Sequence, residues 1–276
     1  MPEPVVRTPL PGWSHEELLY ETADEGKIAI ITMNRPERMN ASDPGMAQRW
    51  VDAWTTFADD DNCLVAIVTG AGDRAFSAGQ DLKIRADLEE EGGDAPYRNR
   101  VRSVVPIGEK LGCWKPTIAA INGYAIAGGW AVAQYCTFRI AAEHAEMNIA
   151  EARWNQGAGF VATLSRIVGI GTALEFCLMG DRRFTAQRAY EVGLVNRVVP
   201  KEQLMDEAID WARTLVRMAP RVISNFNQLV HQCYSMSTLE AQAFASALES
   251  NLRGMEDSLE GPKAFAEKRV AHFKNR

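Results

Sequence analysis

The stretch AFSAGQDLK at residues 75–83, together with INGYAIAGG at residues 121–129, carries most of the information about the fold of this chain. Each segment follows a β-rich apolar run and precedes a helical pattern. A strand, a glycine turn and a helix in this order present unbonded backbone N–H groups to a negative charge. Two such turns facing each other would make an oxyanion hole, which stabilises negative charge on an oxygen atom during a reaction.

The bulk composition indicates a globular protein with an excess of acidic residues. The chain has 276 residues, a formal net charge of −6 and a pI of about 5.4. This balance argues against a nucleic-acid partner, because such a surface needs clustered Lys and Arg. No apolar run approaches the roughly 20 residues of a membrane span, and the N-terminus resembles neither a signal nor a transit peptide. The five cysteines show no metal-ligand spacing and are typical of reduced thiols. We expect a soluble cytoplasmic protein without a metal site or a membrane partner.

The order of the predicted elements indicates one α/β core followed by a helical tail. Residues 1–15 are polar and rich in proline, so we expect an extended arm. Alternating strand and helix patterns fill residues 17–200, including a predicted helix at residues 96–112. The pattern after this alternation is helical to the C-terminus. We therefore expect a core over residues 1–203 and a C-terminal helical region over residues 204–276.

The residues that carry a family resemblance lie in five segments whose order is also that of the family. The segments are residues 31–41 (ITMNRPERMNA), 75–83, 115–129 (KPTIAAINGYAIAGG), 180–182 together with 189–200, and 260–269. Together they resemble the crotonase (enoyl-CoA hydratase/isomerase) superfamily over nearly the whole chain. The resemblance implies a spiral of ββα turns, two roughly perpendicular sheets and a C-terminal helical region that forms trimers or dimers of trimers. It also implies a coenzyme A thioester as substrate and no other cofactor.

The resemblance assigns roles to residues of the two glycine segments. Matched residue by residue, the backbone N–H groups of Gln80 and Gly128 would form the oxyanion hole, so the Gln80 side chain itself is not required. The segment after the first turn would line the CoA site, and basic side chains elsewhere would contact the phosphates or adenine. The CoA-binding residues so predicted are Ala78, Gln80, Asp81, Leu82, Lys83, Arg38 and Lys268. Asp81 has a second interpretation, as the cap of a helix that begins at Leu82.

The acid–base residues depart from the pattern of the family's hydratases, which use two glutamates. The first glutamate is replaced by Ala131, whereas the second is present as Glu151. Hydration needs one group to activate water and another to deliver a proton. A single carboxylate instead suits the transfer of a proton from one carbon of a dienolate to another. We therefore predict that Glu151 acts alone in an apolar pocket, with a raised pKa, and that isomerisation is favoured over hydration.

The predicted acyl pocket departs from the family pattern in the length of one loop. Trp130, Ala131 and Trp154 are the expected pocket residues, while the loop over residues 152–159 is about two residues shorter than usual. This shortening leaves the shape of the acyl group open, with Asn155 or Gln156 as possible replacements for a usual contact. Weaker candidates are Tyr234 for the pocket and Glu143 or Glu146 for a second acid.

These observations favour an acyl-CoA enzyme that works through an enolate held in an oxyanion hole. Alternatives within the same superfamily are 2-enoyl-CoA hydration, decarboxylation and C–C bond hydrolysis, because a shared fold does not determine the reaction. The missing glutamate also leaves open a protein that binds acyl-CoA without catalysis. The sequence does not determine the acyl group.

Overall fold

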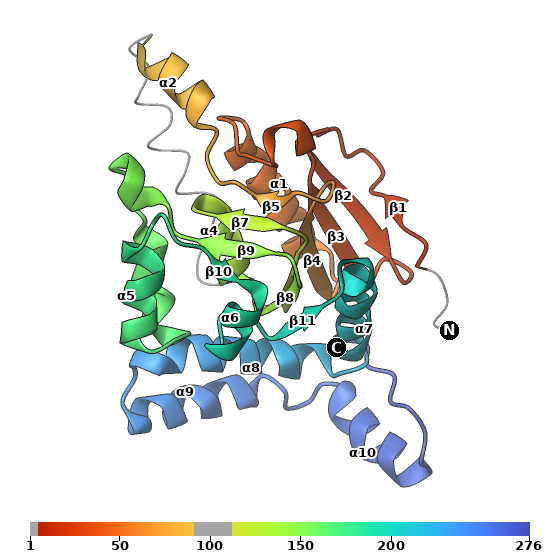
Figure 1. Ribbon diagram of the computed structural model, residues 1–276. Coiled ribbons are helices and arrows are strands. Elements are labelled where there is room, and N and C mark those ends of the chain that lie inside the picture. Colours follow the sequence, from red (N-terminus) through yellow and green to blue (C-terminus); the bar gives the residue numbers. More distant parts are fainter. Residues whose placement is uncertain (1–4, 91–111) are drawn as a thin grey trace.

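The computed structural model describes residues 5–90 and 112–276, and these residues form two β-sheets (Figure 1). Within them the larger sheet has seven strands in the order β1-β2-β3-β4-β6-β8-β11. The strands are β1 (Thr8–Pro9), β2 (Leu18–Ala23), β3 (Ile28–Met33), β4 (Val65–Gly70), β6 (Thr117–Ile121), β8 (Phe138–Ala142) and β11 (Arg197–Val199). The first three strands are antiparallel, and every later pair is parallel.

The smaller sheet has the order β10-β9-β7-β5. Its strands are β5 (Ala75–Ser77), β7 (Tyr124–Ile126), β9 (Glu146–Asn148) and β10 (Phe184–Thr185). β5, β7 and β9 are parallel to one another, and β10 is antiparallel to β9. The chain therefore passes repeatedly from a strand of the large sheet to a strand of the small sheet, which makes a spiral.

Apolar side chains pack against both faces of the large sheet. Along β3 and β4 every residue is buried, as expected for parallel strands covered on both sides. Successive residues point to opposite faces, so Ile31 and Val68 belong to one core, whereas Ile30 and Ile67 belong to the other. One core receives the tryptophans of α1 (Met46–Asp59), and the other is covered by α7 (Leu204–Val216).

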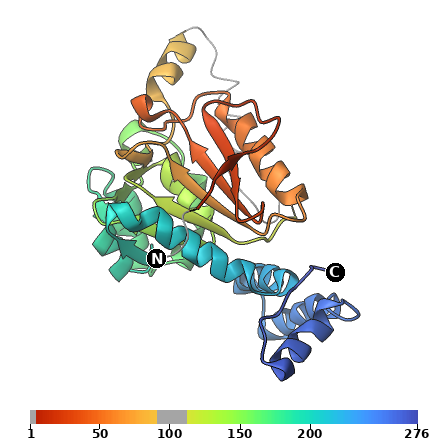
Figure 2. The same ribbon diagram turned by 90° about the vertical axis from the view of Figure 1, so that its right-hand side faces the viewer.

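The remaining helices surround these sheets or extend beyond them. They are α2 (Leu82–Glu90), α4 (Gly128–Tyr135), α5 (Ile170–Leu178), α6 (Ala186–Glu191), α8 (Pro220–Gln232), α9 (Thr238–Ser250) and α10 (Asp257–Glu267). Short 3₁₀ helices are η1 (Pro36–Arg38), η3 (Glu151–Trp154), η4 (Gly159–Arg166), η5 (Lys201–Gln203) and η6 (Cys233–Ser235). Figures 1 and 2 show α8, α9 and α10 at one end of the molecule, away from the sheets.

The structure confirms the mixed α/β fold and corrects several details of the prediction. Each glycine segment contains a strand of its own, β5 or β7, which the sequence pattern did not indicate. The arm predicted over residues 1–15 contains β1, which pairs with β2. The prediction of helix to the C-terminus is wrong after α10, because the Asp257 carboxylate accepts hydrogen bonds from the backbone N–H groups of Lys274 (2.8 Å) and Asn275 (2.7 Å) and holds the tail back against the helix.

The secondary structure does not test two of the predictions. The helix predicted at residues 96–112 lies outside the described residues, apart from residue 112. The boundary placed after residue 203 and the oligomerisation role of residues 204–276 remain predictions. No helix among the described residues has the length and apolar character needed to cross a membrane.

Candidate active site

Three neighbouring strands of the small sheet bring the predicted catalytic residues to one edge. β5, β7 and β9 are parallel, so their carboxyl ends lie at the same edge. Gln80 follows the last residue of β5 by three positions, Gly128 follows β7 by two, and Glu151 follows β9 by three. The topology thus collects on one edge three residues that are far apart in the sequence.

The first glycine turn is fixed by a buried serine. The Ser77 hydroxyl donates to the backbone oxygen of Asn40 (2.8 Å) and accepts from the backbone N–H of Gly79 (3.1 Å). Gly79 has φ +82°, a conformation that favours glycine because it carries no Cβ. An added Cβ there would also lie 2.9 Å from the backbone nitrogen of Gly128. Gly79 therefore both makes the turn and permits its close approach to the second glycine segment.

Asn40 holds the same turn from the opposite side. Its side chain is 1% exposed, and its amide nitrogen donates to the backbone oxygens of Ala75 (2.7 Å) and Ala71 (3.0 Å). Its amide oxygen accepts from the backbone N–H of Arg35 (3.0 Å). The backbone φ of +54° is one that Asn tolerates better than most residues. Buried polar groups need such partners, so Asn40 ties three chain segments together.

The second glycine turn begins a helix. Ala127 has φ +56° and ψ −125° and precedes α4, and its N–H donates to the backbone oxygen of Asn148 in β9 (2.9 Å). Gly128 is the first residue of α4. An added Cβ at Gly129 would lie 2.1 Å from the backbone oxygen of Ser77, so only glycine permits the two turns to pack together here.

The two turns place a pair of backbone donors side by side. A Cβ built on Gly128 would lie 3.6 Å from the Cα of Gly79 and 4.0 Å from the backbone nitrogen of Gln80. Among the described residues, neither the N–H of Gln80 nor that of Gly128 donates a hydrogen bond. Two neighbouring unbonded donors, one at a helix N-terminus, can stabilise a negatively charged oxygen.

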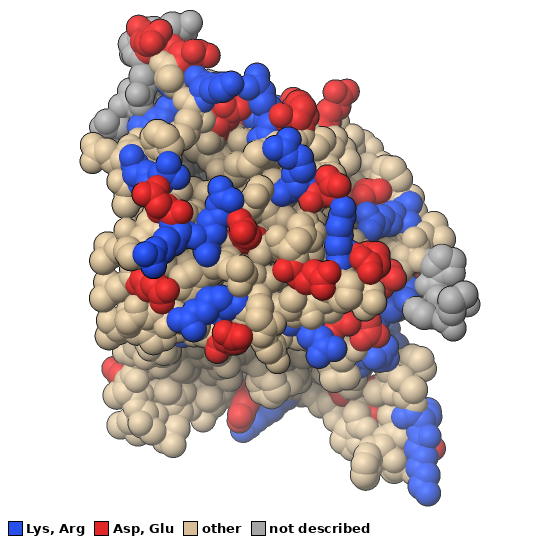
Figure 3. Space-filling view, viewed as in Figure 1, with Lys and Arg blue, Asp and Glu red and all other residues tan. Residues whose placement is uncertain are grey.

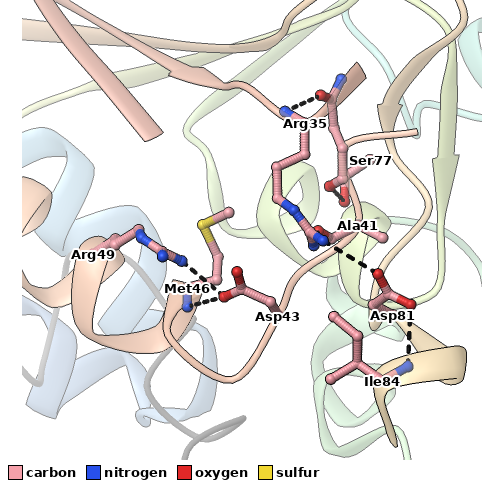
Figure 4. A network of polar contacts seen from close by, with 9 residues as sticks. Arg35, Ala41, Asp43, Met46, Arg49, Ser77, Asp81 and Ile84 are labelled. Atoms are coloured by element: carbon pink, nitrogen blue, oxygen red, sulfur yellow. Dashed lines mark hydrogen bonds and ion pairs between the residues drawn. The ribbon is translucent and has the colours of Figure 1, made fainter. Parts of the chain in front are cut away.

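Asp81 has a structural role beside this turn (Figure 4). Its Oδ1 accepts from the backbone N–H of Ile84 (3.4 Å), and its Oδ2 pairs with Nη2 of Arg35 at 3.4 Å. The side chain is 6% exposed. Asp81 therefore caps α2, which confirms the capping interpretation. In the same view, Asp43 accepts from the backbone N–H of Met46 (2.8 Å) at the start of α1.

Glu151 supplies the titratable group of this edge. It is the first residue of η3, and its Oε2 is buried with no hydrogen-bond partner among the described residues. Burial raises the pKa of the carboxyl group to about 7, although the backbone N–H groups of Ala150 and Glu151 act in the opposite direction. A carboxyl group with this pKa can both accept and release a proton near neutral pH.

The three residues predicted for the acyl pocket differ in position. Ala131 lies partly buried in α4, one turn from Gly128. Trp154 is 52% exposed, with the Arg153 guanidinium 5.4 Å from its ring. Trp130 is 0% exposed, and its indole N–H donates to Oε1 of Gln134 (3.0 Å). The expectation for Trp130 is therefore corrected: its side chain is part of the closed core and does not line an open pocket.

The structure brings together only some of the residues predicted for CoA binding. Ala78, Gln80, Asp81, Leu82 and Lys83 are contiguous around the first turn, and Leu82 and Lys83 are exposed at the start of α2. Arg38 is exposed in η1, which precedes Asn40. Lys268 ends α10 with φ +54°, and Figure 1 shows α10 at the opposite end of the molecule from α2. Within one chain, Lys268 is therefore not brought to the others.

The weaker candidates lie elsewhere. Glu146 begins β9, at the opposite end of the strand from Glu151, and pairs with Arg183 at 2.9 Å. Glu143 is exposed. Tyr234 is 62% exposed, with the Arg166 guanidinium 5.2 Å from its ring. No group of three or more His, Cys, Asp or Glu side chains among the described residues is arranged to hold a metal ion.

Sequence reasoning missed several residues that shape the site. Asn40 lies within a segment that carried the family resemblance, but its hydrogen bonds to residues more than 30 positions away leave no local pattern. Arg85 was also missed. Its Nη1 donates to Oε1 of Gln80 (3.3 Å) and to Oε1 of Gln156. The only sequence signal was the shortened loop that contains Gln156.

A fold with two backbone donors and one partly buried carboxyl group at the same sheet edge is typical of enzymes that stabilise a negatively charged oxygen and move a proton beside it. Comparison with known proteins identifies the family. The model of the enoyl-CoA hydratase/isomerase family matches residues 23–276. The chain therefore belongs to the enoyl-CoA hydratase/isomerase, or crotonase, family and is an acyl-CoA-processing enzyme.

Individual relatives agree with this assignment. The chain is 37% identical over 257 residues to a carnitinyl-CoA dehydratase of Salmonella arizonae, covering 90% of this chain and 95% of the relative. It is 34% identical over 249 residues to an (E)-benzylidenesuccinyl-CoA hydratase of Thauera aromatica, with the same coverage. A crystal structure of an enoyl-CoA hydratase from Bacillus anthracis has a TM-score of 0.84 and 30% identity, and the match covers 94% of this chain and all of the other.

Proposed function

We propose that this chain isomerises 3-enoyl-CoA thioesters to 2-enoyl-CoA thioesters, with Glu151 as the only proton-transferring side chain. The observation that carries the proposal is the buried Oε2 of Glu151, which has no hydrogen-bond partner and belongs to a carboxyl group with a pKa of about 7. It lies at the sheet edge that also carries the unbonded N–H groups of Gln80 and Gly128.

The proposed reaction moves one proton between two carbons. The ionised Glu151 removes a proton from C2, and the electron pair passes into a dienolate whose charge rests on the thioester oxygen. The N–H groups of Gln80 and Gly128 stabilise that oxygen, each contributing about 2.7–4 kcal/mol in the transition state. Protonated Glu151 then returns the proton to C4. Proton count and charge balance without a second acid.

The absence of a second glutamate supports isomerisation over hydration. Ala131 occupies the position where the family's hydratases have a glutamate. Glu146 is engaged with Arg183 at the far end of β9. With only one of the two family glutamates present, water activation and proton delivery would both fall to Glu151.

A second candidate function is reversible hydration of a 2-enoyl-CoA. The relatives named above are a dehydratase and a hydratase at 34–37% identity. In this alternative, Glu151 takes the C2 proton of a 3-hydroxyacyl-CoA and delivers it to the departing hydroxyl group on the same face of the substrate.

Coenzyme A is proposed to bind along residues 78–83, with Arg38 contributing from the same chain and no further cofactor. Large apolar side chains are exposed on α5 and on the C-terminal helices α8, α9 and α10. Examples are Ile170 (71%), Leu178 (66%), Phe226 (60%), Val230 (76%), Leu239 (77%), Leu259 (77%) and Phe265 (87%). Figure 3 shows few charged side chains over α8 and α9. These faces support a homotrimer or a dimer of trimers, in which Lys268 of a second copy can reach the CoA.

The test follows both reactions in three proteins under identical conditions. Wild type should isomerise 3-enoyl-CoA and hydrate crotonyl-CoA slowly. Glu151→Gln should lose isomerisation by at least about a hundredfold, the lower limit for general acid–base catalysis. Ala131→Glu should raise hydration without raising isomerisation. Faster hydration than isomerisation in wild type would favour the second candidate, and undiminished activity in Glu151→Gln would assign the base elsewhere.

A further inference from the structure

A chain of hydrogen bonds leads from the Arg35 guanidinium group to the first glycine turn. Nη1 of Arg35 donates to the backbone oxygen of Ala41 (2.5 Å). The backbone N–H of Ser42 donates to the backbone oxygen of Gly79 (2.7 Å). The next N–H group belongs to Gln80, one of the two donors proposed for the oxyanion hole. Two peptide units therefore lie between the cation and the proposed position of the thioester oxygen.

The shape of the peptide unit sets the direction of each step in this chain. A trans peptide bond is planar, so its C=O and N–H groups point in opposite directions, and the described residues contain no cis peptide bond. The Ala41 oxygen is directed at Arg35, so the N–H of Ser42 points the other way, toward the Gly79 oxygen. Because the Gly79 oxygen is directed at Ser42, the N–H of Gln80 points away from Ser42 and out of the turn.

Arg35 also neutralises the carboxylate that follows Gln80 in the sequence (Figure 4). Nη2 of Arg35 lies 3.4 Å from Oδ2 of Asp81, and the two side chains are only 12% and 6% exposed, so water screens the pair weakly. The backbone N–H of Asp81 donates to the backbone oxygen of Ser42 (2.9 Å), which holds Gln80 from its other side. An unpaired carboxylate beside the donor would disfavour negative charge on a substrate oxygen, because like charges repel.

We propose that Arg35 is a positioning residue that aims and polarises the N–H group of Gln80 for the thioester oxygen. Hydrogen bonds in a chain strengthen one another by about 10–30% per bond, and a cation at the start of the chain adds to this polarisation. Loss of the cation weakens stabilisation of the enolate even though Gln80 keeps its N–H group. The inference rests on the proposed function for the place of the thioester oxygen.

Kinetics of Arg35→Met test this role in the transition state. Methionine has a similar length but carries neither a charge nor a donor. We expect kcat for isomerisation to fall by about 10- to 100-fold, up to the lower end of the range for losing an oxyanion donor. KM should change by less than about threefold, because the affected interaction is strongest in the transition state.

The infrared stretching frequency of a bound thioester carbonyl tests the same role without turnover. A hydrogen bond to a carbonyl oxygen weakens the C=O bond and lowers its frequency. Saturated butanoyl-CoA with an isotope label at the thioester carbonyl should therefore absorb at a lower frequency when bound to wild type than when free in water. Arg35→Met should lose most of this shift. A role of Arg35 in stability alone would not change the shift in the folded variant.

Arg49→Met is a matched control for the loss of a largely buried cation (Figure 4). The Arg49 side chain is 17% exposed and pairs with Asp43 (2.7 Å) and Glu17 (3.2 Å) at the start of α1. This variant should lower the stability to urea but leave kcat and the carbonyl shift unchanged. Arg35→Lys keeps the charge but replaces two donor nitrogens by one. Its losses should lie between those of wild type and Arg35→Met, which provides a second variant if Arg35→Met does not fold.

The outcomes distinguish this inference from the proposed function. An unchanged carbonyl shift in folded Arg35→Met or in Arg35→Lys, or an equal loss in Arg49→Met, would overturn the role of Arg35 alone. Wild type without any shift would refute the oxyanion hole and this inference with it. A shift that is present in wild type and lost in Arg35→Met, in a protein that does not isomerise 3-enoyl-CoA, would support this inference and refute only the proposed reaction.

Discussion

The glycine turns and the segment after β9 both place a polar group at the same sheet edge, but by different means. The turns present backbone N–H groups, and the first turn is fixed by the buried side chains of Asn40 and Ser77. The segment after β9 presents the Glu151 side chain, whose Oε2 is buried without a partner. The proposed role of the turns therefore depends on backbone geometry, whereas the proposed role of Glu151 depends on the free-energy cost of ionising one side chain.

The largest expected effect tests the role of the backbone N–H groups in the glycine turns. Gly128→Pro removes one N–H, and proline is tolerated at the first position of a helix. We expect kcat/KM for any accepted thioester to fall by at least about a hundredfold, the scale for losing one oxyanion donor. Steady-state kinetics give the result, with circular dichroism to confirm folding. A folded variant with normal activity would remove Gly128 from the oxyanion hole.

The second effect concerns the support of the first turn. Asn40→Ala removes the side-chain partner of the partly buried backbone groups of Arg35 and Ala71 and leaves the buried backbone oxygen of Ala75 with only the longer bond from Nδ2 of Asn122 (3.3 Å), so the free energy of unfolding should fall by about 2–4 kcal/mol. Urea denaturation measures this change. Asn62→Ala is a matched control, because Asn62 makes one exposed side-chain bond to the backbone oxygen of Glu25 (2.9 Å) and should cost less than about 1 kcal/mol. Equal losses would mean that the turn is held by other contacts.

The third effect tests the cost of the buried carboxylate. A carboxyl pKa raised from 4.5 to about 7 corresponds to about 3 kcal/mol between the two protonation states. The folded state binds the proton more tightly than the unfolded state, so wild-type stability should fall as pH rises from about 4.5 to about 7 and then level off. Glu151→Gln has no carboxyl group at this position, so its stability should not show this fall.

Denaturation at two pH values checks this expectation. Glu151→Gln should be more stable than wild type at pH 8, by up to about 3 kcal/mol, and similar to it near pH 4. A variant that is less stable than wild type at pH 8 would show that the ionised carboxylate has a favourable partner in the folded protein.

The smallest expected effect separates the role of the Gln80 side chain from that of its backbone N–H group. Gln80→Ala keeps the backbone N–H and removes only the side chain, so kcat/KM for a thioester with an uncharged acyl chain should change by less than about threefold. The measurement uses the same assay as for Gly128→Pro. If the loss reaches that of Gly128→Pro, the Gln80 side chain takes part in catalysis.

The parts of the fold that were predicted correctly have local signals. The alternating strand and helix patterns over residues 17–200 indicated the α/β core, and the glycine motifs indicated the family. β5 and β7 were missed because each is three residues long, which is too short to show a period. The C-terminal tail was misread because its conformation depends on contacts of Asp257 and Glu260 with residues 9–18 positions later.

The candidate site also contains residues that the sequence could predict and residues that it could not. Gln80, Gly128 and Glu151 could be proposed as site residues because each belongs to a motif next to a strand end, and their catalytic roles stay predictions. Trp130 was misassigned because sequence position indicates proximity to Gly128 but not the direction of a side chain on α4. Arg85 and Gln156 are 71 positions apart, and no local pattern indicates a contact over that distance.

The strand order of the two sheets has a consequence for synthesis on the ribosome. Both sheets contain their strands in the order in which they leave the exit tunnel. Each new strand adds to an existing edge, so no strand has to be inserted between two partners that are already paired. The spiral can therefore assemble one turn at a time as the chain emerges, and α7 covers the large sheet only after β11, its last strand, has been made.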